Sequence, residues 1–250
     1  MILGPLCSFL SDYSALLVAS GATGTRIVKN TSRIAESYGC EILLELTATT
    51  VKVQLWSEEV GERAFRSKIV PHTGLSFSRI RQLSSLSWDI SDKLIDFPQA
   101  QKRFQDILNE KALDGRVVRV LTSLANASFC ELFGGDIIAM GLVFIGTYFG
   151  FLLKQRMVKA KSNIYLTFLL CSLCSSLIAS ACYVFSLGNT PDIALGTSVL
   201  FLVPGVPYIN SVCDMMTGNH ILGLGRIIDA TLLTASLSIG FCITFLILGL

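Results

Sequence analysis

The spacing of apolar residues predicts two helices at the start of the chain. Residues from about 9 to 38 carry apolar side chains at helical intervals, and the pattern is interrupted near Ser20 and Gly21. Gly39 follows the second helical stretch, and glycine readily adopts the left-handed conformation found just after helix ends. We therefore expect two consecutive helices joined by a turn near residues 20–21.

The next stretch has the period of strands and then returns to the period of helices. Apolar residues alternate with polar ones over 51–56, as in a strand with one covered face. Asp96 followed by Pro98 is a typical opening of a helix. The predicted elements are strands at 41–46, 51–56 and 65–70, a helix at 80–90, and a further helix from Asp96 onward. Together with the first two helices, they predict an α+β domain over residues 1–115.

Long apolar runs dominate the chain from residue 116 onward. Five of them are close to the ~20 residues that a helix needs to cross a bilayer. They are 117–133, 136–153, 163–187, 193–213 and 226–249. We expect the second domain, 116–250, to be an all-α bundle of about five transmembrane helices. Gly146 with Gly150, and Ser236 with Gly240, have the spacing of small residues that lets helices approach closely, so we interpret both pairs as packing surfaces.

The composition supports a membrane protein with one water-exposed part. Of the 250 residues, 52% are hydrophobic and 15% are charged, whereas about a quarter of the residues in a soluble domain are charged. Up to residue 115 there are 13 basic and 13 acidic residues, and the remainder has 7 and 5. The charges therefore concentrate in the predicted α+β domain. The net charge of +2 and the lack of a basic run give no argument for nucleic-acid binding.

The distribution of lysine and arginine between the apolar runs predicts the orientation in the membrane. Cytoplasmic loops of membrane proteins carry an excess of these residues. The stretch 154–161 contains four of them, whereas 133–136 and 188–192 contain none. We therefore expect the α+β domain and the 154–161 loop in the cytoplasm, and the C-terminus outside.

One apolar run contains residues that interrupt a membrane helix. The stretch 202–214 has two prolines and a glycine, and a proline removes a backbone hydrogen bond to the residue four positions earlier. Pro204 and Pro207 should therefore free the carbonyls of Leu200 and Val203. Lipid cannot satisfy such groups, so a broken helix must face protein or a water-filled cavity.

The residues after the break are polar on one face. Pro207, Asn210 and Asp214 follow one another at helical spacing. One interpretation is a kinked packing helix in which Asp214 marks the membrane edge. The other is a substrate or ion site, because transporters build such sites from discontinuous helices and intramembrane carboxylates. The helix that resumes near Pro207 would offer its N-terminus to an anion.

Further polar residues extend the candidate site. A short connection leads from Asp214 to Arg226 and Asp229, so we expect these three to lie near one another. Arg226 can hold a substrate carboxylate with two hydrogen bonds, and Asp214 or Asp229 can carry a coupled proton. The alternative is that Arg226 is an anchor at the inner membrane surface, paired with Asp229. The candidate substrate-binding residues are Pro204, Gly205, Pro207, Asn210, Asp214, Arg226, Asp229 and, as a weaker candidate, Asn126.

The sequence gives no sign of a metal or cofactor site. His72 and His220 are far apart and have no partners at ligand spacing. The eight cysteines lie mostly in apolar stretches, where buried free thiols are the favoured interpretation. Cys171 and Cys174 have the spacing of a redox pair but fall inside a long apolar run. We expect no cofactor and no catalytic residues.

The motif residues of the membrane part resemble those of the bacterial threonine/serine exporter family. The signature is Leu202-Val203-Pro204-Gly205 with Asn210 and Asp214, followed by Gly218, Gly223 and Arg226. Further matches are Leu132-Phe133-Gly134-Gly135, and Gly21-Ala22 with Arg26. The chain departs from the family at Thr23 and Asn30, where relatives usually have acidic residues. If those carboxylates matter in relatives, the substrate or the coupling of this chain differs.

The length of the chain adds to what the resemblance implies. Single-chain members look like this protein continued into further membrane helices, whereas this sequence ends at Leu250. That length resembles the split branch of the family, in which a large subunit works with a small membrane subunit, and which is associated with succinate export. The resemblance thus implies a multi-pass protein of the bacterial inner membrane and a homo- or hetero-oligomer.

We therefore expect a subunit of a secondary exporter for small carboxylates or amino acids, and not an enzyme. Ion gradients would drive it, since the sequence has no P-loop or other nucleotide motif. The alternative is a membrane-anchored enzyme or sensor that acts through the cytoplasmic domain, and a third possibility is an assembly scaffold. Ser20, Thr23 and Thr25 would be the groups for hydrolysis, but capping of a helix end is the favoured interpretation.

Overall fold

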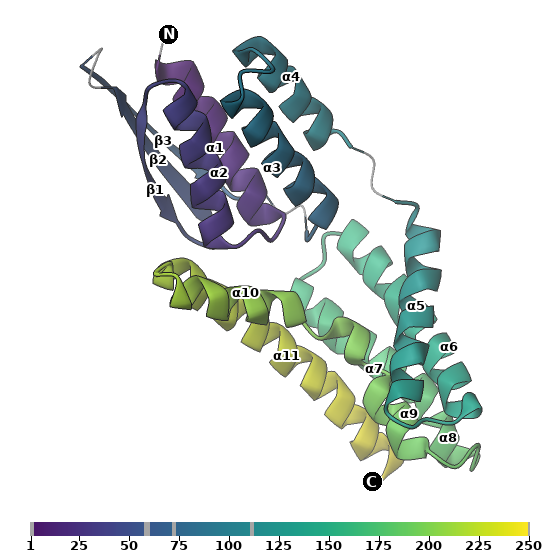
Figure 1. Ribbon diagram of the computed structural model, residues 1–250. Helices are drawn as coiled ribbons and strands as arrows, with labels where there is room; N and C mark the ends of the chain where they lie inside the picture. Colours follow the sequence, from purple (N-terminus) through teal and green to yellow (C-terminus); the bar gives the residue numbers. More distant parts are fainter. Residues whose placement is uncertain (1–2, 58–60, 72–73, 111–112, 250) are drawn as a thin grey trace. The chain divides into compact units, whose positions relative to one another are not determined.

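The computed structural model describes residues 3–57, 61–71, 74–110 and 113–249 (Figure 1). Contacts within the chain define two compact units. The first unit comprises Met1–Lys111 and Gly205–Ile228, and the second comprises Ala112–Pro204 and Asp229–Leu250. From the sequence we expected a cytoplasmic domain up to residue 115 and a membrane domain from residue 116. Contacts within the chain do not show where the bilayer lies, so this boundary stays a prediction.

The first unit contains a three-stranded antiparallel sheet covered on one face by helices. The strands β1 (Glu41–Leu46), β2 (Thr50–Ser57) and β3 (Glu62–Ile69) pair in the order β1-β2-β3. The helices are α1 (Leu3–Ala19), α2 (Gly24–Ser37), α3 (Phe77–Ser91) and α4 (Phe97–Leu108). α1 and α2 pack on the sheet, and α3 packs on α2 (Figure 1). The predicted alternation is confirmed, because Val51, Val53 and Leu55 are fully buried.

Helix ends in this unit follow the signals in the sequence. Gly39 has a φ of +68° just after α2, as its position after the helical pattern predicted. Asp96 accepts a hydrogen bond from the Gln99 amide at 2.9 Å, and the Gln99 side chain accepts one from the Asp96 amide at 3.2 Å. This reciprocal pair opens α4 as a capping box. His72, which we expected to lack ligand partners, lies outside the described residues.

α1 forms the centre of the core of this unit. It is buried nearly all round, and Leu10, Tyr13 and Leu17 have no exposed surface. The Tyr13 hydroxyl donates to the Leu83 carbonyl at 2.7 Å, so this polar atom is satisfied inside the core. Burial raises the pKa of Tyr13 above its ordinary value.

Two later helices complete the first unit. α10 (Gly205–Met216) belongs to it, and so do the first residues of α11 (His220–Leu248). Gly218 has a φ of +87° in the turn between them. A Cβ on Gly223 would lie 2.8 Å from the Ser211 carbonyl oxygen, so only glycine lets the two helices come this close. Leu222 is fully buried in the same core as α1.

The second unit is helical. Its elements are α5 (Gly115–Leu132), α6 (Ile137–Lys159), α7 (Ile164–Ala179), α8 (Ala181–Val184), α9 (Pro191–Thr197), the 3-10 turn η1 (Leu200–Leu202) and the remainder of α11. α6 packs on both α5 and α7. A Cβ on Gly146 would lie 2.8 Å from the Ser175 carbonyl oxygen, and one on Gly240 would collide with the Leu169 carbonyl oxygen. Both glycines are therefore packing positions, as predicted, whereas the Ser236 hydroxyl bonds to Leu232 of its own helix.

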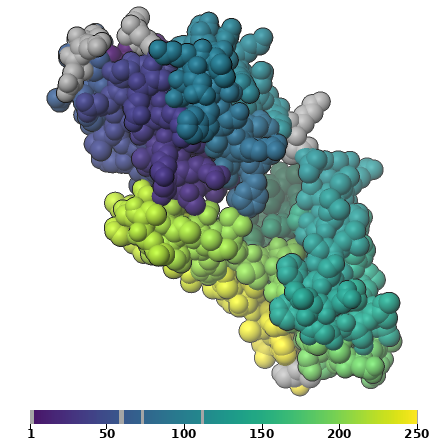
Figure 2. Space-filling model, in the orientation of Figure 1, coloured from purple at the N-terminus to yellow at the C-terminus, as the bar shows by residue number. Residues whose placement is uncertain are grey.

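Three helices of the described residues are long and apolar enough to cross a membrane. They are Ile137–Lys159, Ile164–Val184 and His220–Leu248, and a fourth span results if Pro191–Leu202 and Gly205–Met216 are counted together. The run 117–133 lies in α5, which is not among them, so five crossings stay a prediction. Several large apolar side chains of α5 and α6 are exposed, including Leu121, Leu124, Phe129, Ile145 and Phe149. Figure 2 shows the surface of these two helices in teal.

Two further expectations from the sequence need correction. The cation-rich stretch that we expected as a loop is helical as far as Lys159, because α6 continues past the apolar run. Lysine and arginine are good helix formers, so charge alone does not end a helix. All eight cysteines are free, but Cys242, which we expected to be a buried thiol in an apolar stretch, is exposed in the structure, as is Cys213.

Candidate functional site

The candidate site forms around backbone groups at the turn between α1 and α2. α1 ends with the amides of Gly21 and Ala22 bonded back to the carbonyls of Val18 and Leu17, each at 3.0 Å. This pattern satisfies the last carbonyls of the helix. The carbonyls of Gly21 and Ala22 themselves are left for partners from elsewhere in the first unit.

Asp214 of α10 reaches the start of α2. Its carboxylate is fully buried, and its Oδ1 accepts a hydrogen bond from the Gly24 amide at 2.6 Å. Gly24 is the first residue of α2, and Thr23, at the capping position, makes no side-chain hydrogen bond to the helix. The positive end of a helix dipole favours an anion. Asp214 therefore supplies, from 190 positions away in the chain, the cap that Thr23 does not provide.

Arg226 of α11 binds the same carboxylate and the turn at once. Its Nη1 forms an ion pair with the Asp214 Oδ2, and its Nη2 donates to the Ala22 carbonyl at 2.7 Å. Asn210 of α10 donates to the neighbouring Gly21 carbonyl at 2.8 Å. Three side chains from α10 and α11 thus bind backbone groups of the α1–α2 turn and of the first residue of α2.

Burial makes this cluster costly to disturb. The Arg226 side chain is 10% exposed and that of Asp214 is 0% exposed. Two charges removed from water lose hydration, and their attraction compensates only where further hydrogen bonds satisfy the remaining atoms. Here both carboxylate oxygens and both terminal nitrogens of the guanidinium have partners. The pair is therefore satisfied as it stands, and loss of either partner leaves a buried charge.

The sequence prediction of this cluster is correct in part. Asn210, Asp214 and Arg226 do lie together, but Arg226 pairs with Asp214 and not with Asp229, which is exposed on α11. Asn126 lies in the second unit, where its Nδ2 donates to the Thr147 hydroxyl at 2.7 Å and to the Thr197 carbonyl at 3.2 Å. Its bonds tie α5 to α6 and α9.

The helix break differs in detail from the prediction. The Leu200 carbonyl is not free, because it accepts from the Val203 amide at 3.1 Å in the 3-10 turn. Helical structure resumes at Gly205, so Pro207 lies in the first turn of α10 rather than at the break. A proline there costs no hydrogen bond, since the amides of a first turn have no partner within the helix.

One residue of the site, Gly24, carried no signal that sequence reasoning used. Gly24 sits so close to Asn219 that a Cβ on it would lie 2.8 Å from the Asn219 Cγ. The capping that we favoured for Ser20 is wrong, because Ser20 is fully buried at the end of α1 and its hydroxyl has no hydrogen-bond partner among the described residues. Glycine at such a close approach can be found only from the fold, because a sequence does not show which element will pack there.

A broken helix beside a buried carboxylate–arginine pair is typical of α-helical membrane transporters. The chain belongs to the threonine/serine exporter family, whose family model, described as "Putative threonine/serine exporter", matches residues 8–248.

Two curated relatives cover nearly the whole chain. The chain is 27% identical over 238 residues to the "Probable succinate transporter subunit YjjP" of Escherichia coli, with 94% of this chain and 91% of the relative covered. It is 26% identical to the protein of the same description from Klebsiella aerogenes, with 94% and 90% covered. No solved structure matches the chain significantly. The family and these relatives identify a membrane exporter, as the resemblance implied.

Proposed function

We propose that the chain is a subunit of a secondary exporter for small carboxylates or amino acids, driven by an ion gradient. The family membership and the relatives described as succinate transporter subunits support this. The single observation that supports a substrate site is the set of groups that binds the Asp214 carboxylate, which we call the seat. That seat consists of the guanidinium of Arg226 and the amide of Gly24 at a helix N-terminus.

The same seat suits the carboxylate of a substrate. Arginine binds carboxylates with two parallel hydrogen bonds, and helix N-termini bind anions. In the structure the Asp214 carboxylate takes this place. Protonation of Asp214 removes its negative charge and weakens its bond to Arg226, so a substrate carboxylate can replace it. Proton binding and substrate binding are thereby coupled through one residue.

The neighbouring residues have supporting roles in this proposal. Asn210 holds the α1–α2 turn against α10, and Pro204 and Gly205 mark the break in helical structure after which α10 begins. Pro207, Asp229 and Asn126 stay candidate substrate-binding positions in this proposal, because they are polar or helix-breaking residues in otherwise apolar runs.

The chain is proposed to work with a small membrane subunit of the same exporter, as a hetero-oligomer in the bacterial inner membrane. The description of the relatives as transporter subunits supports this. We propose that residues 1–115 lie in the cytoplasm and the C-terminus outside, because of the positive charges at 154–161.

Metabolite measurements in a deletion strain test the proposed function. An exporter changes the ratio of one solute between the inside and the outside of the cell, whereas an enzyme changes its total amount. We expect the inside-to-outside ratio of succinate, threonine or serine to rise, and the chain together with its small subunit to restore it. A change in total amount at a constant ratio would contradict export and favour the enzyme alternative.

A further inference from the structure

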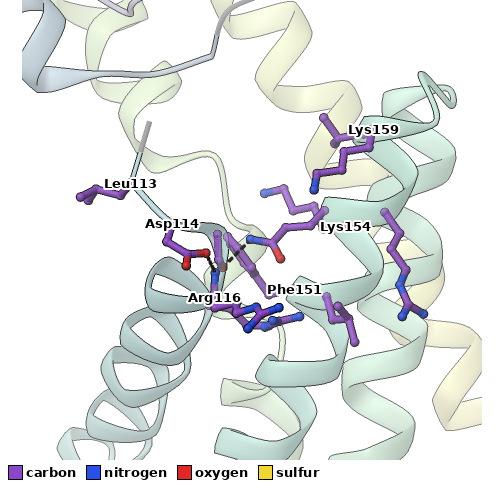
Figure 3. A pocket seen from close by; sticks show the side chains of 12 residues that line it. Leu113, Asp114, Arg116, Phe151, Lys154 and Lys159 are labelled. Atoms are coloured by element: carbon purple, nitrogen blue, oxygen red, sulfur yellow. Dashed lines mark hydrogen bonds between the residues drawn. The ribbon is translucent and has the colours of Figure 1, made fainter. Parts of the chain in front are cut away.

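The second unit contains a strongly basic cavity that the proposed transport site does not use. It has a volume of about 710 Å³ and lies between the start of α5 and the last turns of α6 (Figure 3). Five cationic side chains line it, together with one carboxylate. The cations are Arg116, Arg119, Lys154, Arg156 and Lys159, and the carboxylate is Asp114. None of the five forms an ion pair within the described ranges.

The polar groups beside the cations are occupied by the backbone. Asp114 accepts a hydrogen bond from the Arg116 amide at 2.9 Å and so caps α5. Gln155 donates to the Gly115 carbonyl at 2.8 Å. Figure 3 shows Asp114 and Arg116 on α5, and Lys154 and Lys159 on α6 on the other side of the hollow. The cavity thus presents excess positive charge from two helices.

Arg119 is the residue that distinguishes this cavity from an ordinary cationic membrane border. Its residue surface is only 9% exposed, and its Nε has no hydrogen-bond partner in the part of the chain described. Its guanidinium lies 4.7 Å from the centroid of the Tyr148 ring. Border cations extend their charged ends into water. A buried guanidinium with an unpaired N–H lining a cavity instead indicates an anionic ligand.

Lys154 is held in a similar way. Its ammonium lies 4.7 Å from the centroid of the Phe168 ring and 5.9 Å from that of Phe151. Aromatic rings position a cation but do not neutralise its charge. Arg119 and Lys154 therefore remain available for a phosphate, while their aromatic neighbours fix where they sit.

The position along α6 indicates a lipid rather than a free anion. α6 has 23 residues, about 34 Å at 1.5 Å per residue, against about 30 Å for the hydrocarbon core. Its last turns therefore reach the depth of the phospholipid headgroups. Leu113, Phe151 and Leu152 add apolar walls to the cavity, and these suit the glycerol and the upper acyl chains.

We propose that this cavity binds the phosphate of an anionic phospholipid, with Arg119 and Lys154 as its anchoring cations. Basic pockets at the ends of membrane helices bind such headgroups in other proteins. The proposal depends on α6 crossing the bilayer and not on transport, so failure of the exporter mechanism would leave it standing.

Native mass spectrometry of the purified chain in a non-ionic detergent tests the proposal. The probes are phosphatidylglycerol and phosphatidylcholine with identical acyl chains. We expect the anionic lipid to bind at least tenfold more tightly, and the Arg119→Gln/Lys154→Gln variant to lose at least tenfold of that affinity. The control, Lys102→Gln/Lys161→Gln, removes two cations that do not line the cavity and should bind as the wild type does.

Three results would overturn the proposal. The first is equal binding of the two lipids, and the second is an equal loss in the cavity variant and the control variant. The third is full displacement of the lipid by low-millimolar inorganic phosphate or succinate, which would make the cavity a site for free anions. If the Arg119→Gln change prevents folding, Arg116→Gln/Lys154→Gln provides the same test at two less buried positions.

Discussion

The guanidinium of Arg226 bridges the carboxylate of Asp214 and the carbonyl of Ala22, so one side chain of α11 joins α10 to the turn between α1 and α2. Because Asp214 also accepts from the Gly24 amide at 2.6 Å, the charge of Asp214 is shared between an arginine and a helix N-terminus. This arrangement stabilises the first unit, and in our proposal it is also where the substrate carboxylate enters.

Replacing Arg226 by methionine should destabilise the protein by about 3–5 kcal/mol, because the Asp214 carboxylate would remain buried without its cation. The Asp214→Asn/Arg226→Met variant should lose less than the sum of the two single changes, since no buried charge is left. Unfolding in detergent, followed by circular dichroism, measures both effects.

A matched control comes from the ion pair between Arg103 and Asp89, which are 2.5 Å apart with side chains 49% and 21% exposed. Arg103→Met should cost only about 0–1 kcal/mol. Equal losses for Arg103→Met and Arg226→Met would contradict the account of a tightly satisfied buried pair.

Gly24→Ala should lower stability by about 1–3 kcal/mol, the usual cost of overpacking, since its Cβ would lie 2.8 Å from the Asn219 Cγ. The Asn219→Gly change should restore most of the loss by removing that side chain. Gly4→Ala is the control, because a Cβ there meets no atom within 4 Å. Thermal midpoints of Gly24→Ala, Asn219→Gly, Gly24→Ala/Asn219→Gly and Gly4→Ala give the comparison. A double variant no more stable than Gly24→Ala would show that the close approach is not the cause.

Single cysteines at Lys159 and Asn189 should be labelled from opposite sides of the membrane in a version without other thiols. Both residues are exposed, and the first lies in the cation-rich end of α6 that we place in the cytoplasm. An impermeant maleimide applied to whole cells should label position 189 alone. Labelling of both positions from outside would contradict the proposed topology.

The elements of the first unit could be predicted because their periodicity reflects burial. Val51, Val53 and Leu55 alternate with polar residues, and all three are fully buried on one face of the sheet. The end of α6 could not be predicted in this way. Lys154 and Lys159 suggested a loop by their charge, but a helix continues wherever its backbone hydrogen bonds can form.

The side chains of the candidate site could be predicted from the sequence, but their backbone partners could not. Asn210, Asp214 and Arg226 were found because polar residues are rare in apolar runs. Their partners are the Gly21 and Ala22 carbonyls and the Gly24 amide. Backbone groups are present at every residue, so nothing in the sequence distinguishes the three that a helix about 190 positions later will bind.

The most direct test of the central claim compares two modes of transport in vesicles that contain Asp214→Asn protein with its small subunit. Net efflux driven by a pH gradient needs a residue that gains and loses a proton, whereas exchange of labelled for unlabelled substrate does not. Asparagine can still accept from the Gly24 amide, but its side-chain amide does not bind and release a proton as a carboxylate does. Gly146→Leu is the packing control, since it should lower the amount of folded protein rather than the activity of each molecule.

Per folded molecule, we predict that Asp214→Asn reduces net efflux about a hundredfold, the scale of about 2.7 kcal/mol at tenfold per 1.36, while exchange persists. Asn210→Ala should reduce both modes, because it releases the turn that carries the seat. Near-normal net efflux by Asp214→Asn, or an equal loss of exchange and net efflux, would contradict the claim that Asp214 couples proton and substrate.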